Sequence, residues 1–318
     1  MGWGEAQAPL APEVSATIVN LLLRAAIEGE PFDGSRGRIE ELWERMYCTM
    51  RVRGQTGGFM LDAIAGVDLA LWDLGGKIAG VPVAAMLGSA RTTVPAYLSG
   101  VAGATLGDKM EYARRYRDQG FSKCKIYYES DWPAVLDQVA ALRSGFGDVA
   151  VDALWHLDPA LAPSLDPLDA LWLECPIPPE DPAAHERLAA SITTPLALGE
   201  SYRTVRELEP FFERRVMRYV QPDLGRCGIT ESLRIAARAA GLEVVPHVSI
   251  ALGPQIAAAI HFSAAACDLC EFNPRVLEVA NRFLGEPIRM DGASYVIPTR
   301  PGLGIDIDEN SVAAVSLQ

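Results

Sequence analysis

The sequence has few histidines, no excess of basic residues and no long, uninterrupted apolar run. Only four of its 318 residues are histidine, and the formal net charge is −13. A strongly acidic chain is not attracted to nucleic acid or to an anionic membrane surface, so we expect neither as a partner. The longest apolar stretch, 249–267, is interrupted by Pro254, Gln255 and His261. It therefore predicts a helix buried within the fold and not a membrane span.

Cysteine spacing argues against a zinc-binding protein, and the start of the chain argues against a secreted one. Cys267 and Cys270 form one isolated C-x-x-C pair in an apolar stretch, and no second pair stands at zinc-site spacing. Free, buried thiols in a reducing compartment are the simpler interpretation of the six cysteines. The opening MGWGE has neither the basic start nor the apolar core of a signal peptide. We therefore expect a cytoplasmic, globular protein.

The chain does contain a regular series of acid and base side chains, each closing a short apolar run. Successive members are 22 to 27 residues apart, which is the length of one strand, one helix and two turns. The members are Lys125, Asp152, Glu174, Glu200, Asp223, His247 and Glu271. In a barrel of alternating strands and helices, they would form a ring at the carboxyl ends of the strands, where such barrels have their active sites.

This alternation predicts an α/β fold built on a TIM-type barrel over residues 93–280. The connection between Asp152 and Glu174 contains Pro159, Pro163 and Pro167, so we expect an irregular helix there. The expected strands are short runs that read as buried on both faces: 94–99, 124–127, 149–153, 171–174, 195–198, 219–221, 243–246 and 269–272.

Two further regions flank the predicted barrel. Helical periodicity over 13–30 and 62–79 predicts a mostly helical region within residues 1–92. The final stretch, 281–318, contains a strand-like run at 295–297. We expect this stretch to leave the barrel and return to the N-terminal region.

The three carboxylates Asp152, Glu174 and Glu200 close successive strands and are expected to converge. Converging carboxylates repel one another unless a cation lies between them, and an all-oxygen ligand set favours a hard ion. The pattern therefore predicts a Mg²⁺ site. The alternative interpretation is that each carboxylate pairs with a nearby arginine.

Asp223 and His247 close the next two strands. An aspartate beside a histidine fixes the tautomer of the ring, raises its pKa and makes it a better general base. We therefore predict His247 as a catalytic base and Asp223 as its partner; the alternative is a histidine with a structural role. Glu271 completes the ring and is expected to hydrogen-bond a substrate carboxylate.

Strand alternation places Lys123, Lys125 and Tyr127 on the same, inward face. Lys125 and Tyr127 are candidate catalytic residues, and Lys123 is a candidate for substrate binding. Arg203, which follows Glu200 closely, is a further candidate for binding a substrate anion. The alternative for Arg203 is an ordinary surface position.

The order of these residues on successive strands resembles that of the enolase superfamily, in its mandelate racemase/muconate lactonizing enzyme-like group. The segments GWGEA (2–6), GVDLALWD (66–73), QPD (221–223) and PGLG (301–304) are also similar to signatures of that group. The resemblance implies a modified TIM barrel of (β/α)7β type with an α+β capping domain. It also implies Mg²⁺ and a Lys or His base that removes the α-proton of a carboxylate to form an enediolate.

The lysine strand departs from the family pattern. Counted from Gly120 and Phe121, the family's two lysines fall on Lys125 and Tyr127; in the alternative register they fall on Lys123 and Lys125. A tyrosine with an ordinary pKa near 10 is a poor base at neutral pH. Racemisation requires bases on both faces of a carbon, so the first register favours dehydration or lactone cycloisomerisation.

Three other departures concern the surroundings of the site. Leu154 stands where the family often has asparagine, and His156 is the nearest histidine that could supply an acid there. Cys175 stands where a second glutamate commonly follows Glu174. The chain opens at the GWGE signature, so we expect a capping domain that is truncated at its N-terminus and leaves the site more exposed.

We therefore expect an enzyme, a carbon–oxygen lyase that dehydrates a sugar acid to a 2-keto-3-deoxy acid with Mg²⁺. A racemase, an epimerase or a sugar-lactone cycloisomerase is the first alternative, and a non-catalytic member of the family is the second. The expected partner is a small-molecule carboxylate substrate, and the expected assembly is a homo-oligomer.

Overall fold

A parallel β-sheet curved into a barrel occupies the centre of the protein. The computed structural model describes residues 1–8, 10–128 and 130–316. Each strand from β1 to β7 pairs in parallel with the next, and β8 pairs in parallel with β1. The barrel strands are β1 (Thr93–Ser99), β2 (Lys123–Tyr127), β3 (Asp148–Asp152), β4 (Leu173–Glu174), β5 (Leu196–Leu198), β6 (Tyr219–Val220), β7 (Glu243–Val244) and β8 (Cys270–Phe272). The predicted TIM-type α/β fold is confirmed.

The closure between β7 and β8 differs from the other strand pairs. No pairing of these two strands occurs within residues 130–316, although both flank the same barrel interior. Pro246 follows β7 and has no N–H to donate, which interrupts a ladder on this side. The barrel is therefore joined less tightly here than elsewhere.

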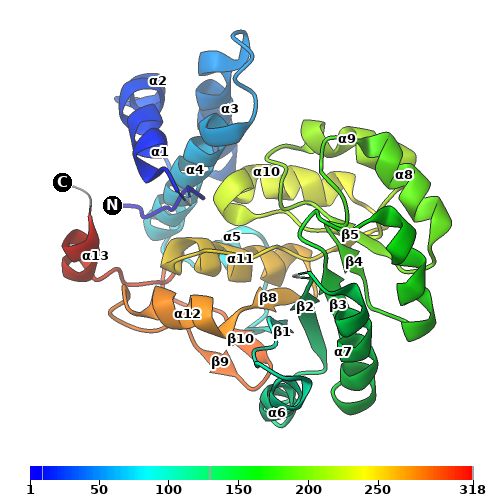
Figure 1. The fold of residues 1–318 in the computed structure, drawn as a ribbon. Coiled ribbons are helices and arrows are strands. Elements are labelled where there is room, and N and C mark those ends of the chain that lie inside the picture. The colour runs from blue at the N-terminus through cyan, green and yellow to red at the C-terminus, as the bar shows by residue number, and fades with distance from the viewer. Residues whose placement is uncertain (9, 129, 317–318) are drawn as a thin grey trace.

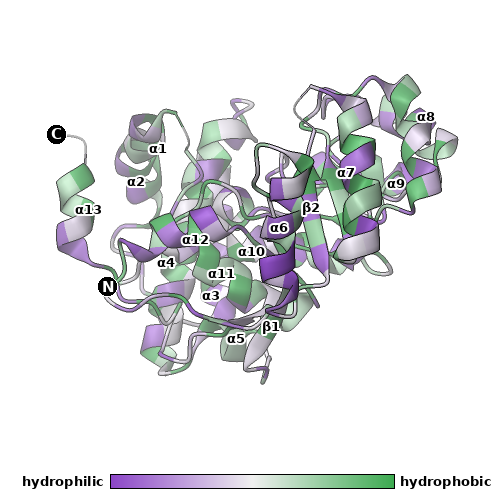
Figure 2. Cartoon of the chain, turned by 60° about the horizontal axis from the view of Figure 1, so that its bottom comes forward, coloured by the Kyte–Doolittle hydropathy of each residue, from purple (hydrophilic) through white to green (hydrophobic). Residues whose placement is uncertain are grey.

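Helices cover the outside of the barrel, as Figure 1 shows. Several begin with a side-chain cap, for example Thr105 and Asp108, which form a reciprocal capping box at the start of α6. Hydrophilic residues cover much of this helix (Figure 2), and Ala113 is its buried residue. The covering helices are α6 (Leu106–Arg117), α7 (Trp132–Gly145), α8 (Pro182–Ser191), α9 (Val205–Arg214), α10 (Leu224–Arg238), α11 (Gly253–Ala266) and α12 (Pro274–Asn281).

Two expectations about the helices are confirmed. The proline-rich connection after β3 forms a 3-10 helix, η2 (Pro159–Leu168), in place of a regular α-helix. The apolar stretch at 249–267 contains α11, which is buried from Gly253 to Ala264. Among the described residues, no helix combines the length and apolar character that crossing a membrane requires.

The N-terminal region is helical and packs against the barrel through α10. The predicted helical segments correspond to α1 and its continuations and to α4, whereas α3 was not predicted. Its apolar residues Ile39, Leu42, Trp43 and Met46 follow helical spacing and are buried. The elements are α1 (Pro12–Ile18), the π-helical η1 (Val19–Leu23), α2 (Arg24–Ile27), α3 (Arg36–Arg51), α4 (Gly58–Ala79) and α5 (Val83–Met86).

The last part of the chain runs back along the barrel toward this helical region. Strands β9 (Met290–Asp291) and β10 (Ser294–Val296) form a hairpin, and β10 pairs antiparallel with β1. Beyond it, the N–H of Leu303 donates to Asp73 in α4, and α13 (Glu309–Val315) follows. The C-terminal segment therefore connects the barrel to the helical region.

Candidate active site

The ring of charged side chains forms at the carboxyl ends of the barrel strands. Lys125, Asp152, Glu174 and Glu271 lie within strands β2, β3, β4 and β8, and the other members lie two or three residues beyond the ends of β5, β6 and β7. Asp152 pairs in register with Glu174 on the next strand. Because side chains alternate along a strand, this register directs both carboxylates into the barrel.

An aromatic layer lies below the ring and closes it from the other end of the barrel. Tyr97, Trp172 and Tyr219 pack together, with the rings of Trp172 and Tyr219 centred 4.8 Å apart. The indole Nε1 of Trp172 donates to Glu174 Oε2 at 2.8 Å, and Gln221 Nε2 donates to the same oxygen at 2.7 Å. These donors hold the Glu174 carboxylate in one orientation.

Lys125 lies at the centre of the ring with its side chain only 1% exposed. Its Nζ is 2.5 Å from Glu174 Oε1, 2.9 Å from Glu271 Oε1 and 3.9 Å from Asp152 Oδ2. Burial alone would lower the pKa of Lys125, but Glu174 and Glu271 raise it well above its ordinary value. Lys125 is therefore a fixed positive charge and holds its proton too firmly to act as a base.

Three ligand atoms are arranged closely enough to hold a metal ion. One atom each from Glu174, Glu200 and His247 lies within 4.8 Å of the others. Asp152 is not part of this group of described residues and faces Lys125. Glu200 Oε2 is buried without a hydrogen-bond partner, although His247 Nε2 is 3.1 Å away.

Excess negative charge at this site favours binding of a cation. Burial, followed by repulsion from Glu174, raises the pKa of Asp152 well above its ordinary value, and burial also raises the pKa of Glu200. Both shifts mean that the ionised carboxylates lack enough compensating positive charge. Because the donors are mainly oxygens, the residues present fit a hard divalent ion such as Mg²⁺.

His247 and Asp223 form a hydrogen-bonded pair. His247 Nδ1 lies 2.7 Å from Asp223 Oδ2, so the ring donates from Nδ1 to the acceptor-only carboxylate and leaves Nε2 facing the site. Burial opposes the charged ring, but Glu200 and Asp223 raise the pKa of His247 to about 10. At that pKa the ring stays charged as long as nothing neutralises Glu200. A cation held by Glu200 would offset this charge, and the pair would then have the geometry of a general base with an orienting carboxylate.

A second hydrogen-bond network, centred on Ser99, lies beside Lys125. Ser99 Oγ donates to Glu271 Oε1 and lies 2.9 Å from the hydroxyl of Tyr127. Burial raises the pKa of Tyr127 to about 12, so the phenol keeps its proton at neutral pH. Burial also opposes ionisation of Glu271, but Lys125 and His247 lower its pKa to about 2.

Models of two protein families match nearly the whole chain. "Enolase C-terminal domain-like" matches residues 108–311, and "Mandelate racemase / muconate lactonizing enzyme, N-terminal domain" matches residues 1–88. The chain is a mandelate racemase-like member of the enolase superfamily. The resemblance inferred from the ring of charged residues is therefore confirmed.

Named relatives are similar along nearly the full length of this chain. A D-galactonate dehydratase from Variovorax paradoxus is 32% identical, with 99% of this chain and 87% of that protein covered. A D-galactarolactone cycloisomerase from Agrobacterium fabrum is 30% identical, with coverage of 98% and 87%. The crystal structure of an enolase-superfamily member from Agrobacterium tumefaciens has a TM-score of 0.92 at 33% identity, with coverage of 98% and 82%.

The structure of one more distant relative contains a metal ion. A racemase from Streptomyces coelicolor A3(2) has bound magnesium and a TM-score of 0.83 at 25% identity, with 96% of this chain and 85% of that chain covered. In the present chain, the acidic donor set described above lies at the carboxyl ends of the barrel strands.

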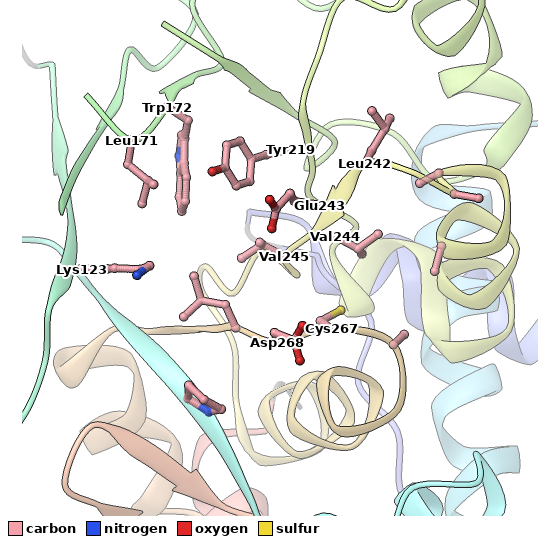
Figure 3. A pocket seen from close by; sticks show the side chains of 16 residues that line it. Lys123, Leu171, Trp172, Tyr219, Leu242, Glu243, Val244, Val245, Cys267 and Asp268 are labelled. Carbon is pink, nitrogen blue, oxygen red and sulfur yellow. The ribbon is translucent and has the colours of Figure 1, made fainter. Parts of the chain in front are cut away.

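Lys123 is not part of the site, contrary to the expectation that it binds substrate. It begins β2, and its Nζ is 3.4 Å from Asp148, which begins β3. Figure 3 shows Lys123 lining a cavity of about 480 Å³ with Tyr219 and Glu243, which begin β6 and β7. Two residues along a strand span about 6.6 Å, so Lys123 faces the opposite end of the barrel from the ring.

Arg203 is also not a free substrate-binding group. Its Nε donates to Asp62 Oδ1 of α4 at 2.9 Å, and its Nη1 donates to the carbonyl of Ser201. Asp62 is buried and needs this positive charge. Arg203 therefore joins the barrel to the helical N-terminal region.

We expect Arg203→Ala to lower the free energy of unfolding by about 3 kcal/mol, because it leaves Asp62 as a buried, unpaired carboxylate. Arg218→Ala is the matched control, since its pair with Glu243 is exposed on both sides. That control should cost less than about 1 kcal/mol. Urea denaturation of both variants measures the difference, and equal losses would contradict the assigned role of Arg203.

Sequence reasoning missed Ser99, Gln221 and Gln255, which donate hydrogen bonds to the charged ring. The first two had a usable signal. Ser99 ends β1 in the same alternation as Tyr97, and Gln221 lies two residues before Asp223. Gln255 lies within a buried helix, and no sequence pattern indicates its contact with Asp223.

Proposed function

We propose that this protein removes the α-proton of a sugar-acid carboxylate and then eliminates water from the neighbouring carbon. The product would be a 2-keto-3-deoxy acid. The Asp223–His247 pair carries the proposal, because its Nε2 faces the carboxylate cluster and its other nitrogen is held by an acceptor. Two relatives, a galactonate dehydratase and a galactarolactone cycloisomerase, support enzymatic activity on acid sugars.

Asp152, Glu174 and Glu200 would hold the metal ion, with Lys125 between two of them. When bound, Mg²⁺ supplies positive charge that acidifies the carbon next to a coordinated carboxylate. His247 Nε2 would take the proton from that carbon, and Asp223 would stabilise the resulting imidazolium. Lys125 would pair with the substrate carboxylate. Glu271 is ionised and only accepts hydrogen bonds, so it would hold a neighbouring hydroxyl group and not the substrate carboxylate that the sequence led us to expect.

The two faces of the site support elimination better than racemisation. His247 on one side would act as the base once a cation offsets the charge of Glu200, the largest cause of its raised pKa. Lys125 and Tyr127 on the other side keep their protons at neutral pH. A phenol that keeps its proton can donate it to a departing hydroxyl group. Tyr127 is therefore the proposed acid for dehydration.

Lactone cycloisomerisation is the second candidate. It shares the α-proton abstraction by His247, but its leaving group is a carboxylate, which departs without an acid. The relative from Agrobacterium fabrum, a galactarolactone cycloisomerase, favours this candidate. The role of Tyr127 separates the two reactions, since only dehydration needs its proton.

Turnover of acid sugars and their lactones in D₂O with Mg²⁺ tests the proposal. We expect a sugar-acid substrate to yield a 2-keto-3-deoxy product, detected by mass spectrometry and NMR. Tyr127→Phe should then lower kcat by about a hundredfold for a sugar acid and less than about threefold for a lactone. Return of substrate one mass unit heavier would indicate an epimerase. Absence of exchange with the whole substrate set would favour a non-catalytic member of the superfamily.

A further inference from the structure

The Asp223 carboxylate has two donors on its other oxygen, Oδ1, which does not contact His247. Asp223 Oδ1 accepts from the N–H of Gly225 at 2.8 Å and from Gln255 Nε2 at 3.0 Å, while Oδ2 pairs with His247. Both Asp223 and Gln255 are fully buried. With Oδ1 held by two donors, rotation of the carboxylate is restricted and Oδ2 stays directed at the imidazole.

Because Gly225 has no side chain, the Gln255 amide can occupy the space beside it. A Cβ at Gly225 would lie 2.4 Å from Gln255 Oε1, closer than real contacts allow. Gln255 Oε1 has no hydrogen-bond partner, so the amide gives up one acceptor interaction in order to present Nε2 to Asp223. This arrangement indicates that the contact with Asp223 determines the orientation of the amide.

Gln255 belongs to α11, and a residue near the N-terminus of the chain caps the first turn of this helix. The residue before α11, Leu252, provides no side-chain cap. Instead, the Glu5 carboxylate accepts the N–H of Leu252 at 2.7 Å and the N–H of Gln255 at 3.1 Å. The first turn of a helix has unpaired N–H groups, and a carboxylate there restricts where the turn lies.

The segment that carries Glu5 is itself closely packed. A Cβ at Gly4 would lie 2.0 Å from the carbonyl oxygen of Gly66 in α4, and the N–H of Gln7 donates to the carbonyl of Gly225 at 2.8 Å. The N-terminal segment is thus wedged between α4 and the beginning of α10 (Figure 1). Glu5 is therefore held on a segment that is packed on both sides.

We propose that Glu5 and Gln255 are positioning residues for the proton-transfer pair, so that the N-terminal region holds Asp223 and His247 in their reactive arrangement. Glu5 fixes the first turn of α11, that turn places the Gln255 amide, and the amide orients Asp223. This role rests on the proposed function of His247 as the base. Within the described residues, neither side chain hydrogen-bonds to Asp152, Glu174 or Glu200.

The first test observes the histidine directly and needs no substrate. The chain has four histidines, so ¹⁵N-histidine spectra of the metal-free protein at one pH can be assigned with His247→Asn. We expect the Nδ1 signal of His247 to lose its hydrogen-bonded shift in Gln255→Leu and to change less in Glu5→Gln, which keeps one acceptor oxygen. An unchanged signal in both folded variants would overturn the proposal.

The second test separates positioning from general loss of structure. In Gln255→Leu we expect kcat for α-proton exchange to fall about tenfold while KM changes less than about twofold. Asp181→Ala is the matched control, because Asp181 caps α8 through the N–H of Ala184, far from the pair in sequence and contacts. This control should lose thermal stability and keep kcat.

The two tests also distinguish failure of the inference from failure of the proposed function. If no acid sugar is turned over, the histidine spectrum alone decides whether Glu5 and Gln255 position His247. If exchange occurs and Gln255→Leu lowers kcat no more than Asp181→Ala does, the positioning role is contradicted while the proposed function stands.

Discussion

Replacing His247 by asparagine should lower the rate of α-proton exchange by about a thousandfold. The reason is that His247 is the base in the proposed reaction, and a positioned base contributes about a hundredfold to ten-thousandfold. Asparagine has nearly the same size and can still donate to Asp223, so little else should change. The measurement is deuterium incorporation at the α-carbon in D₂O, followed by NMR with Mg²⁺ present.

Lys123→Ala is the control for this experiment. Lys123 lies at the opposite end of the barrel and pairs with a partly exposed Asp148. Its removal should leave the exchange rate within about twofold of the original, because exposed ion pairs contribute little. Exchange that persists in His247→Asn at more than a tenth of the original rate would assign the base to another group.

Replacing Glu200 by glutamine should abolish the stabilisation that Mg²⁺ provides. At a hundred times its Kd, a bound ligand stabilises a fold by about 2.7 kcal/mol. Glu200 offers the one buried carboxylate oxygen near the ring that lacks a hydrogen-bond partner among the described residues, so it is free to bind a metal ion. Thermal melting with and without Mg²⁺ and isothermal titration calorimetry measure the loss.

Glu243→Gln is the matched control for the metal experiment. Glu243 is exposed, pairs with Arg218 and begins β7 at the opposite end of the barrel. Its replacement should leave the Mg²⁺-dependent rise in melting temperature intact. If Glu200→Gln bound Mg²⁺ as tightly as the original protein, Glu200 would be excluded as a ligand.

The two sides of the ring differ in what they can do to a proton. On the metal side, burial and repulsion from Glu174 raise the pKa values of Asp152 and Glu200, which shows that the two carboxylates lack compensating positive charge. On the other side, Lys125 is surrounded by carboxylates and Tyr127 retains its phenolic proton. A site with one base and one acid on separate sides is suited to elimination, and this asymmetry is why racemisation is the weaker candidate.

Most of the barrel could be predicted because its signal is local. Each strand is a short apolar run that ends in a charged residue, and each connection has the length of a helix. The proline-rich connection after β3 was predicted to be irregular for an equally local reason, since proline cannot donate a backbone hydrogen bond. Helix α3 had the same kind of signal, in the spacing of Ile39, Leu42, Trp43 and Met46, and was overlooked.

Only interatomic distances in the structure decided which of the candidate residues belong to the site. Alternation places Lys123 and Lys125 on one face, and only the strand register shows which of them reaches the carboxylates. Arg203 follows a candidate metal ligand in sequence, but its partner Asp62 is 141 residues away. Neither fact can be obtained from neighbouring residues in the sequence.

By itself, then, the sequence determined the ring: the repeat length sets the barrel, and strand alternation turns one charged side chain per strand toward a common centre. Only the tertiary structure decided how that ring is held. The contacts from Glu5 to α11, from Gln255 to Asp223 and from Arg203 to Asp62 join segments distant along the chain. Such contacts depend on how whole elements pack against one another, and this packing cannot be predicted from local periodicity.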